Sequence, residues 1–133
     1  RVNQYINEMK TIFILDNLDN LMKGGRLTKI AAHIASLLNI KLILGGDEEG
    51  NIKLIDKSRG NKRAFKRFVE IIGIEAGVTE GKTIGIAHCN ALDRANELKA
   101  QLEKDFHFKS IFIVEMAGLS SAYANEGGIV VAF

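Results

Sequence analysis

The sequence contains no tryptophan and no proline, and only one of its 133 residues is a cysteine. A lone cysteine, Cys89, cannot form an internal disulfide or a metal site by itself, which favours a reducing, cytoplasmic location. Aromatic residues make up only 7% of the chain, too few for the stacking platform of a nucleic-acid binder. Without proline, glycine is the only residue left to interrupt helices and strands strongly.

Neither sign of charge dominates, because the formal net charge is only +2. Outside one cluster the basic residues are mixed with acidic ones, so we expect no nucleic-acid partner. The longest apolar runs have about five residues, far short of the ~20 that cross a bilayer, so we expect no stable membrane insertion. The length and the hydrophobic content of 47% are typical of one globular domain.

Short apolar segments rich in β-branched residues alternate with segments of helical periodicity. The first kind predicts six strands, at residues 11–15, 40–44, 52–55, 84–89, 110–115 and 129–133. The second kind predicts the end of a helix over 1–10, a helix that leads from Asp16 or Asn17 to Gly24, and helices over 28–38, 61–72 and 90–106. A Gly- and Asp-rich turn at 45–51 predicts an antiparallel hairpin. The predicted class is therefore α/β with a mixed sheet of about six strands.

Glycines end the helix that precedes Arg26. Gly24 and Gly25 supply a helix C-terminus and a tight turn, and they leave the Arg26 guanidinium at the corner between two helices. An arginine in this place can bind an anion or simply face solvent. The segment has neither the spacing nor the preceding strand of a phosphate-binding glycine loop.

The only basic cluster of the chain surrounds the start of the helix predicted over 61–72. Arg59 lies just before this helix, and Lys62 and Arg63 occupy its first turn. A helix N-terminus attracts anions, whereas basic side chains there oppose the helix dipole, so their charge has a plausible use in binding. A solvated surface is the alternative reading.

The loop over 117–128 is long and rich in small residues. Ser120, Ser121, Tyr123 and Asn125 offer hydroxyl and amide groups to a carboxylate or phosphate, although the loop could equally serve only to reverse the chain. His88 stands at a strand end, where α/β sheets often bind ligands. No histidine has further potential metal ligands at a suitable spacing in the sequence, so no metal is expected.

Several of these segments together resemble the C-terminal domain of the DegV family of bacterial fatty-acid-binding proteins. The resemblance covers essentially the whole chain, and its residues are Asp16-Asn17-Leu18, Leu21 to Arg26, Leu37 to Lys41, Gly50, Arg59-Gly60, Lys62-Arg63 and His88. It implies that residues 1–133 are a single two-layer domain, the lipid-binding half of a two-domain protein whose N-terminal domain is absent from this chain. The start of the chain at Arg1, inside a predicted helix, agrees with that expectation.

The resemblance also implies a function. Proteins of this family hold one long-chain fatty acid, and some present its carboxylate to a separate kinase subunit that makes an acyl-phosphate for phospholipid synthesis. Such a protein is a carrier without catalytic residues or a cofactor of its own. Arg26 corresponds to an arginine near the head group, and Arg59, with Lys62 and Arg63, to a surface for kinase docking.

Tyr123 departs from the family pattern, because it stands where the family has a histidine shortly before its last strand. A tyrosine hydroxyl can donate to a carboxylate but cannot become cationic. For the tail, the helices over 28–38 and 61–72 can form a slot on the sheet that is lined by Ile30, Ile34 and Phe65, or these residues can form a closed core.

Two other functions remain open from the sequence. The first is a domain of an enzyme related to dihydroxyacetone kinases, in which His88 would have to bind the substrate covalently. The second is a regulatory α/β module that binds an amino acid at an interface. The ligand that copurifies with the protein separates these possibilities.

Overall fold

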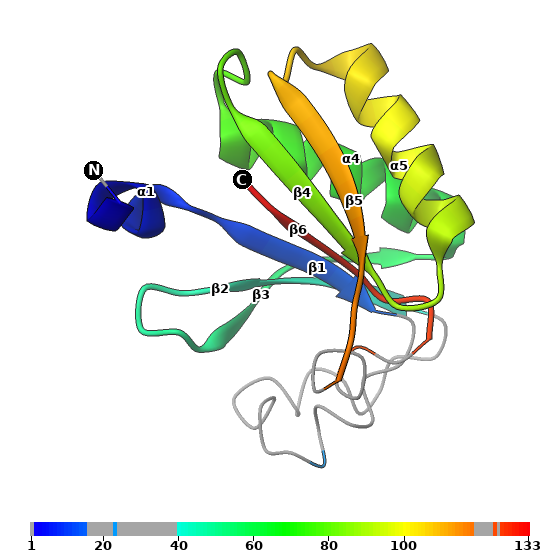
Figure 1. The fold of residues 1–133 in the computed structure, drawn as a ribbon. Helices are drawn as coiled ribbons and strands as arrows, with labels where there is room; N and C mark the ends of the chain where they lie inside the picture. The colour runs from blue at the N-terminus through cyan, green and yellow to red at the C-terminus, as the bar shows by residue number, and fades with distance from the viewer. Residues whose placement is uncertain (1, 16–22, 24–39, 119–123, 125) are drawn as a thin grey trace.

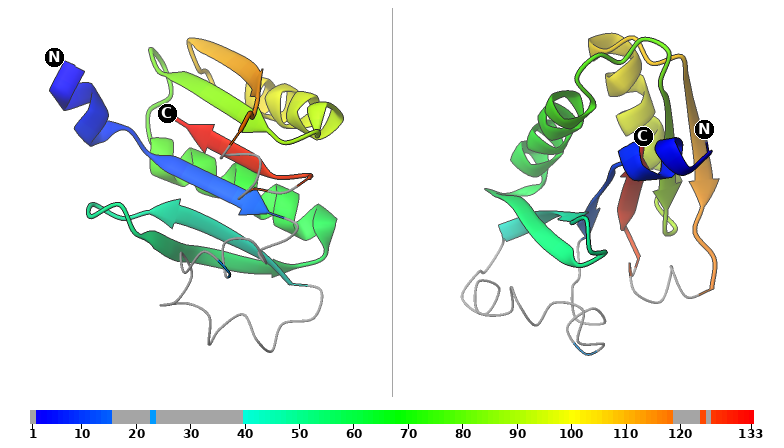
Figure 2. Two further views of the ribbon diagram at one scale, coloured as in Figure 1. Left: turned by 60° about the horizontal axis from the view of Figure 1, so that its bottom comes forward. Right: turned by 90° about the vertical axis from the view of Figure 1, so that its left-hand side faces the viewer.

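The computed structural model describes residues 2–15, 23, 40–118, 124 and 126–133. Its elements are α1 (Val2–Glu8), β1 (Thr11–Leu15), β2 (Ile40–Gly46), β3 (Ile52–Arg59), α4 (Asn61–Ala76), β4 (Thr83–His88), α5 (Leu92–Asp105), β5 (Ser110–Glu115) and β6 (Ile129–Ala132). Six strands form one sheet, and α4 and α5 lie together on one side of it (Figure 1, Figure 2). The predicted α/β class with a mixed six-stranded sheet is confirmed.

The strand order is β3-β2-β1-β6-β4-β5. Among the described strands only β4 and β5 are parallel, because α5 connects them by a crossover; every other neighbouring pair of this sheet is antiparallel. The hairpin predicted around residues 45–51 joins β2 to β3. β3 continues to Arg59, four residues beyond the predicted end, because Asp56 to Arg59 keep pairing with β2 after a bulge at Ile55.

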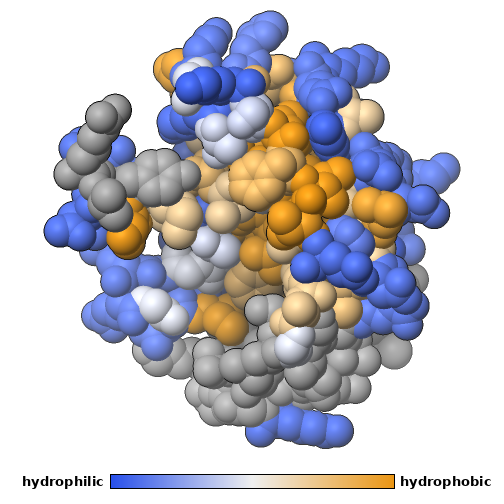
Figure 3. All heavy atoms as spheres, viewed as in Figure 1, coloured by the Kyte–Doolittle hydropathy of each residue, from blue (hydrophilic) through white to orange (hydrophobic). Residues whose placement is uncertain are grey.

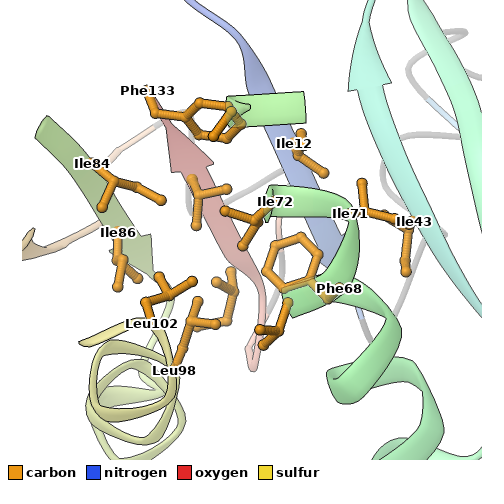
Figure 4. Packing of buried hydrophobic residues seen from close by; sticks show 14 of the residues in the cluster. Ile12, Ile43, Phe68, Ile71, Ile72, Ile84, Ile86, Leu98, Leu102 and Phe133 are labelled. Carbon is orange, nitrogen blue, oxygen red and sulfur yellow. The ribbon is translucent and has the colours of Figure 1, made fainter. Parts of the chain in front are cut away.

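The main core lies between the sheet and the two helices (Figure 4). Alternate strand residues point toward the helices, as the two-residue period of a strand requires. The helices meet them with Phe68, Ile71 and Ile72 from α4 and with Leu98 and Leu102 from α5. A second, smaller cluster is formed by Leu15, Leu42, Leu44 and Ala124, and Phe13 packs against it.

An ion pair fixes α4 to the sheet. The Arg67 side chain donates a hydrogen bond from Nε to Asp56 Oδ2 at 2.5 Å, and a second guanidinium nitrogen lies 3.2 Å from Glu70 Oε2. The Arg67 hydrogen bond, with a second one from the backbone N–H of Lys57, lowers the pKa of Asp56 below its usual value. Arg67 is therefore already paired and differs in this respect from the other basic residues near the start of α4.

Gly73 gives a stability prediction. A Cβ at Gly73 would lie 2.6 Å from Cε1 of Phe106 and closer still to Cζ, and that ring is held edge-to-face by Phe108. Gly73→Ala should therefore lower the free energy of unfolding by about 1 kcal/mol, because the overpacking cost of ~1–3 kcal/mol exceeds the ~1 kcal/mol gain in helix propensity. Urea denaturation measures the change. In a Phe106→Ala background the same substitution should instead stabilise the protein; destabilisation in both backgrounds would contradict the steric explanation.

Candidate functional site

The connections that carry the candidate residues gather at one edge of the sheet. β1, β3, β4 and β5 end there, and β2 and β6 begin there, as the pairs Ile40↔Arg59, Ile14↔Ile129 and His88↔Ile129 show. The strand arrangement therefore brings together the ends of the segments over 16–39 and 117–128, the start of α4 and the start of α5. We call this the loop edge of the sheet; in Figure 1 it is the lower end of β5 and β6.

A cavity opens at the loop edge between the first turns of α4 and α5. The cavity is small, with a volume of about 50 Å³, and it is lined by Ile14, Lys41, Asn61, Ala64, Phe65, Phe68, Arg94, Leu98 and Ile129. Most of these side chains are apolar, and the polar ones are two cations and an amide. Such a lining suits a ligand with an apolar body and an anionic or polar end.

Phe65 is the predicted tail-binding residue that the structure describes. Its side chain is partly buried and borders the cavity together with Phe68, which is 1% exposed, whereas Ile72, on the same face of α4, is fully buried in the core and does not line the cavity. The first two turns of α4 therefore border the cavity, and the later turns pack in the core. The predicted tail slot also includes Ile30 and Ile34, which lie outside the described residues, so it stays a prediction.

The last connection before β6 is tied to the start of α5. The backbone N–H of Gly127 donates to the Cys89 carbonyl at 2.8 Å, and the Cys89 N–H donates to the Gly128 carbonyl at 3.0 Å. Arg94 Nη1 donates to the Gly127 carbonyl at 2.7 Å, and Asn90 Nδ2 donates to Glu126 Oε1 at 3.0 Å. Gly127 has a φ of 91°, which a residue with a side chain rarely adopts.

His88 has a structural contact in this part of the fold. It is 5% exposed, and its Nδ1 accepts a hydrogen bond from the backbone N–H of Ala91 at 3.0 Å, directly before α5. A buried imidazole whose Nδ1 is engaged in this way is poorly placed to attack a substrate. Among the described residues, moreover, no group of three or more His, Cys, Asp or Glu side chains could hold a metal ion.

The predicted docking residues surround the start of α4. Arg59, Lys62 and Arg63 are exposed, and no described carboxylate lies within ion-pair distance of them. Gly60 precedes the helix with a φ of 82°, and no described side chain caps the helix. The start of α4 thus combines a helix N-terminus with cations that have no ion pair to a described carboxylate, an arrangement that favours an acidic partner.

The other candidate residues are not described by the structure. Arg26, Ile30, Ile34, Ser120, Ser121 and Tyr123 lie outside the described residues, as do the two helices predicted between residues 16 and 39. Sequence reasoning missed Asn61 and Arg94 as cavity-lining residues, and it noted Lys41 only as part of the family resemblance. No local sequence pattern identifies these three residues as neighbours, because β2, α4 and α5 each contribute one of them and only the tertiary fold brings them together. Within the described part of the chain, no helix has the length and apolar character to cross a membrane.

Comparisons with known proteins show which family and which individual proteins the chain is similar to. The family model described as "Uncharacterised protein, DegV family" matches residues 1–133. The curated DegV domain-containing protein spr0652 of Streptococcus pneumoniae (strain ATCC BAA-255 / R6) is 30% identical over 132 residues, which are 99% of this chain and 46% of that protein.

Two solved structures are also similar. A DegV-family protein from Ruminococcus gnavus ATCC 29149, refined with vaccenic acid, has a TM-score of 0.92 and 42% identity, covering 99% of this chain and 47% of its own. The Streptococcus pneumoniae fatty acid kinase (Fak) B3 protein, loaded with linoleic acid, has a TM-score of 0.87 and 31% identity, with coverages of 99% and 46%. The chain thus spans about half the length of these relatives. Since the family model matches the chain over its entire length, the chain belongs to the DegV family.

Proposed function

We propose that this chain is the lipid-binding half of a two-domain carrier that holds one long-chain fatty acid and presents its carboxylate to a partner kinase. The carrier has no catalytic residue or cofactor of its own, and it works in the cytoplasm, where Cys89 stays reduced. The cavity at the loop edge is the observation that carries this proposal. Its apolar lining accepts a hydrocarbon chain, and Lys41 and Arg94 supply positive charge nearby.

The physical chemistry of an acyl chain fits such a cavity. Each buried methylene contributes about 0.8 kcal/mol, so burial of even half a long tail supplies several kcal/mol of binding free energy. The described cavity is too small to enclose a whole long-chain fatty acid. The rest of the tail would therefore need Ile30 and Ile34 from the predicted helix over 28–38. The relatives from Ruminococcus gnavus and Streptococcus pneumoniae hold vaccenic and linoleic acid, which supports the same ligand class here.

The head group needs partners at the same edge. Arg26, Tyr123, Ser120 and Ser121 are the candidates. The segments that contain them begin or end at the loop edge, beside Leu15, Ile40 and Gly128. A guanidinium and hydroxyl groups can together bind a carboxylate by charge-assisted hydrogen bonds. The exposed cations Arg59, Lys62 and Arg63, at the start of α4 on the same edge, would then receive the kinase next to the carboxylate.

Phe65→Asp tests the proposal. The full-length protein is purified without detergent, and its bound lipid is measured by native mass spectrometry and by organic extraction. The wild type should carry a stoichiometric C14–C18 fatty acid, the usual length range of membrane acyl chains. Phe65→Asp places a carboxylate against the tail, so we expect at least a tenfold loss of oleate affinity.

Two control variants make this result specific. Ile74→Asp places the same charge on α4 at a side chain that is 68% exposed and does not line the cavity, and it should bind as the wild type does. Phe65→Leu keeps an apolar lining and should retain most of the affinity. If folded Phe65→Asp, checked by circular dichroism, binds oleate as tightly as Ile74→Asp, the cavity is not the tail site. A wild-type protein without extractable lipid would argue against the carrier itself.

A further inference from the structure

Arg94 occupies an unusual place for a cation. In Figure 3 the hydrophilic residues lie around the margin of the molecule, and hydrophobic residues fill the middle of that face. Arg94, in the first turn of α5, is instead partly buried and lines the mostly apolar cavity at the loop edge. Burial of a charge costs free energy unless a partner compensates it, and a cation in the first turn of a helix also opposes the helix dipole. The place of Arg94 therefore points to a use for its hydrogen bonds.

One of these hydrogen bonds reaches a distant part of the chain. Nη1 of Arg94 donates to the Gly127 carbonyl at 2.7 Å, across 33 positions of the sequence. A hydrogen bond from a charged donor is stronger than one between neutral groups. Because the acceptor is a backbone atom, this bond fixes the course of the chain at Gly127, two residues before β6 begins.

Further hydrogen bonds make the same junction specific. The backbone N–H of Gly127 donates to the Cys89 carbonyl at 2.8 Å, and Asn90 Nδ2 donates to Glu126 Oε1 at 3.0 Å. Asn90 and Gly127 have φ values of 49° and 91°, which asparagine and glycine adopt more readily than other residues. Of these three bonds, only that of Arg94 comes from a side chain that also lines the cavity.

The junction is close in sequence to the predicted head-group residues. Tyr123 precedes Gly127 by four positions, and Ser120 and Ser121 precede it by seven and six. An extended chain spans at most ~3.6 Å per residue, so the position of Gly127 limits the region that these side chains can reach. A carboxylate is bound tightly only where its donors are held in place before it arrives.

We propose that Arg94 is a positioning residue of the carrier, which holds the Gly127 carbonyl beside the cavity and thereby places the last connection at the ligand carboxylate. This inference rests on the proposed function, because it concerns the same ligand. In this role Arg94 acts through the connection and is not itself the group that binds the carboxylate. Loss of the guanidinium should therefore weaken the contacts of the head group and leave those of the tail.

A double-mutant cycle in the natural full-length polypeptide tests the inference. The three proteins are Arg94→Met, a loop variant with Ser120→Ala, Ser121→Ala and Tyr123→Phe, and the combination of both. The Kd for oleate is measured for each after removal of bound lipid. We expect Arg94→Met and the loop variant each to bind oleate at least tenfold more weakly. The combined variant should bind within about threefold of the weaker of the two, because both changes remove the same contacts.

A second ligand and a control variant make the result specific. Methyl oleate has the same tail without a carboxylate, and Arg94→Met should change its Kd less than twofold. Lys99→Met removes the same charge from α5 at a side chain whose ion pair with Glu103 is 3.9 Å long and which does not line the cavity. It should bind oleate as the wild type does. If Arg94→Met does not fold, as checked by circular dichroism, Arg94→Lys takes its place in the cycle.

Each other outcome overturns the inference. Losses that multiply in the combined variant would mean that Arg94 contacts the carboxylate itself or supports the fold in general. Equal losses for oleate and methyl oleate would mean general damage to the cavity. Wild-type affinity in Arg94→Met or in the loop variant would mean that the last connection is not positioned for the head group. A wild-type protein that binds no oleate overturns the proposed function as well, whereas tight binding with multiplied losses overturns only the role of Arg94.

Discussion

Phe68→Ala should lower the free energy of unfolding by about 3–5 kcal/mol. The Phe68 side chain is 1% exposed and packs between α4 and the sheet among Ile12, Ile43 and Ile72 (Figure 4). Its truncation removes a large apolar surface from the core and leaves a cavity that the surrounding strands cannot fill. Domains of this size have total stabilities of roughly 5–15 kcal/mol, so the variant should keep only a minor part of its stability or fail to fold at 37 °C.

Urea denaturation followed by circular dichroism measures this loss. Ile74→Ala is the matched control, because Ile74 lies on the same helix but is 68% exposed. That variant should stay within about 0.5 kcal/mol of the wild type. A loss below 1 kcal/mol for Phe68→Ala would mean that the two layers are not packed as described.

Reversal of the three exposed charges at the start of α4 should greatly weaken productive contact with the proposed partner kinase. The triple variant Arg59→Glu, Lys62→Glu and Arg63→Glu turns an attractive surface into a repulsive one for an acidic partner, and like charges across an interface cost several kcal/mol. We expect at least a hundredfold lower rate of kinase-dependent acyl-phosphate formation. Fatty acid binding should not change, since none of the three side chains lines the described cavity.

A control variant with the same change in net charge distinguishes the loss of a docking surface from a general effect of net charge. Lys53, Lys104 and Lys109 are exposed but lie away from the start of α4, and their reversal to glutamate changes the net charge by the same amount. This control should retain most of the activity, and the wild-type rate should fall as salt is added. Misfolding is a poor explanation for a loss in the first variant, because acidic residues favour the first turn of a helix. Equal losses in both variants would refute a docking surface at α4.

The sequence predicted the secondary structure of the described residues because their periodicities are strong. The strand predicted at 110–115 agrees with β5 at both ends, and α5 differs from its prediction by one or two residues at each end. The larger differences have tertiary causes. β3 continues to Arg59 because β2 offers a partner for its polar residues, and α4 continues to Ala76 because the sheet buries Ala76 beneath it.

The family resemblance also came from the sequence, since it rests on residue types at fixed spacings, and the family model that matches residues 1–133 confirms it. The spacing of residues along the chain does not, however, determine the order of the strands in the sheet. The order β3-β2-β1-β6-β4-β5 depends on packing between distant segments, and it places the ends of most strands at one edge.

The cavity depends on that order. The cavity joins Lys41, Asn61 and Arg94 from three separate elements, and no local pattern signals their meeting. Alternation along β4 and β5 shows that each strand has two faces, but only the positions of α4 and α5 decide which face is buried. The sequence by itself thus determined the elements, the class and the family, because local periodicity and motifs encode them. Tertiary packing alone decided which residues share the cavity and which side of the sheet α4 and α5 cover, because both arise from contacts between residues far apart in the chain.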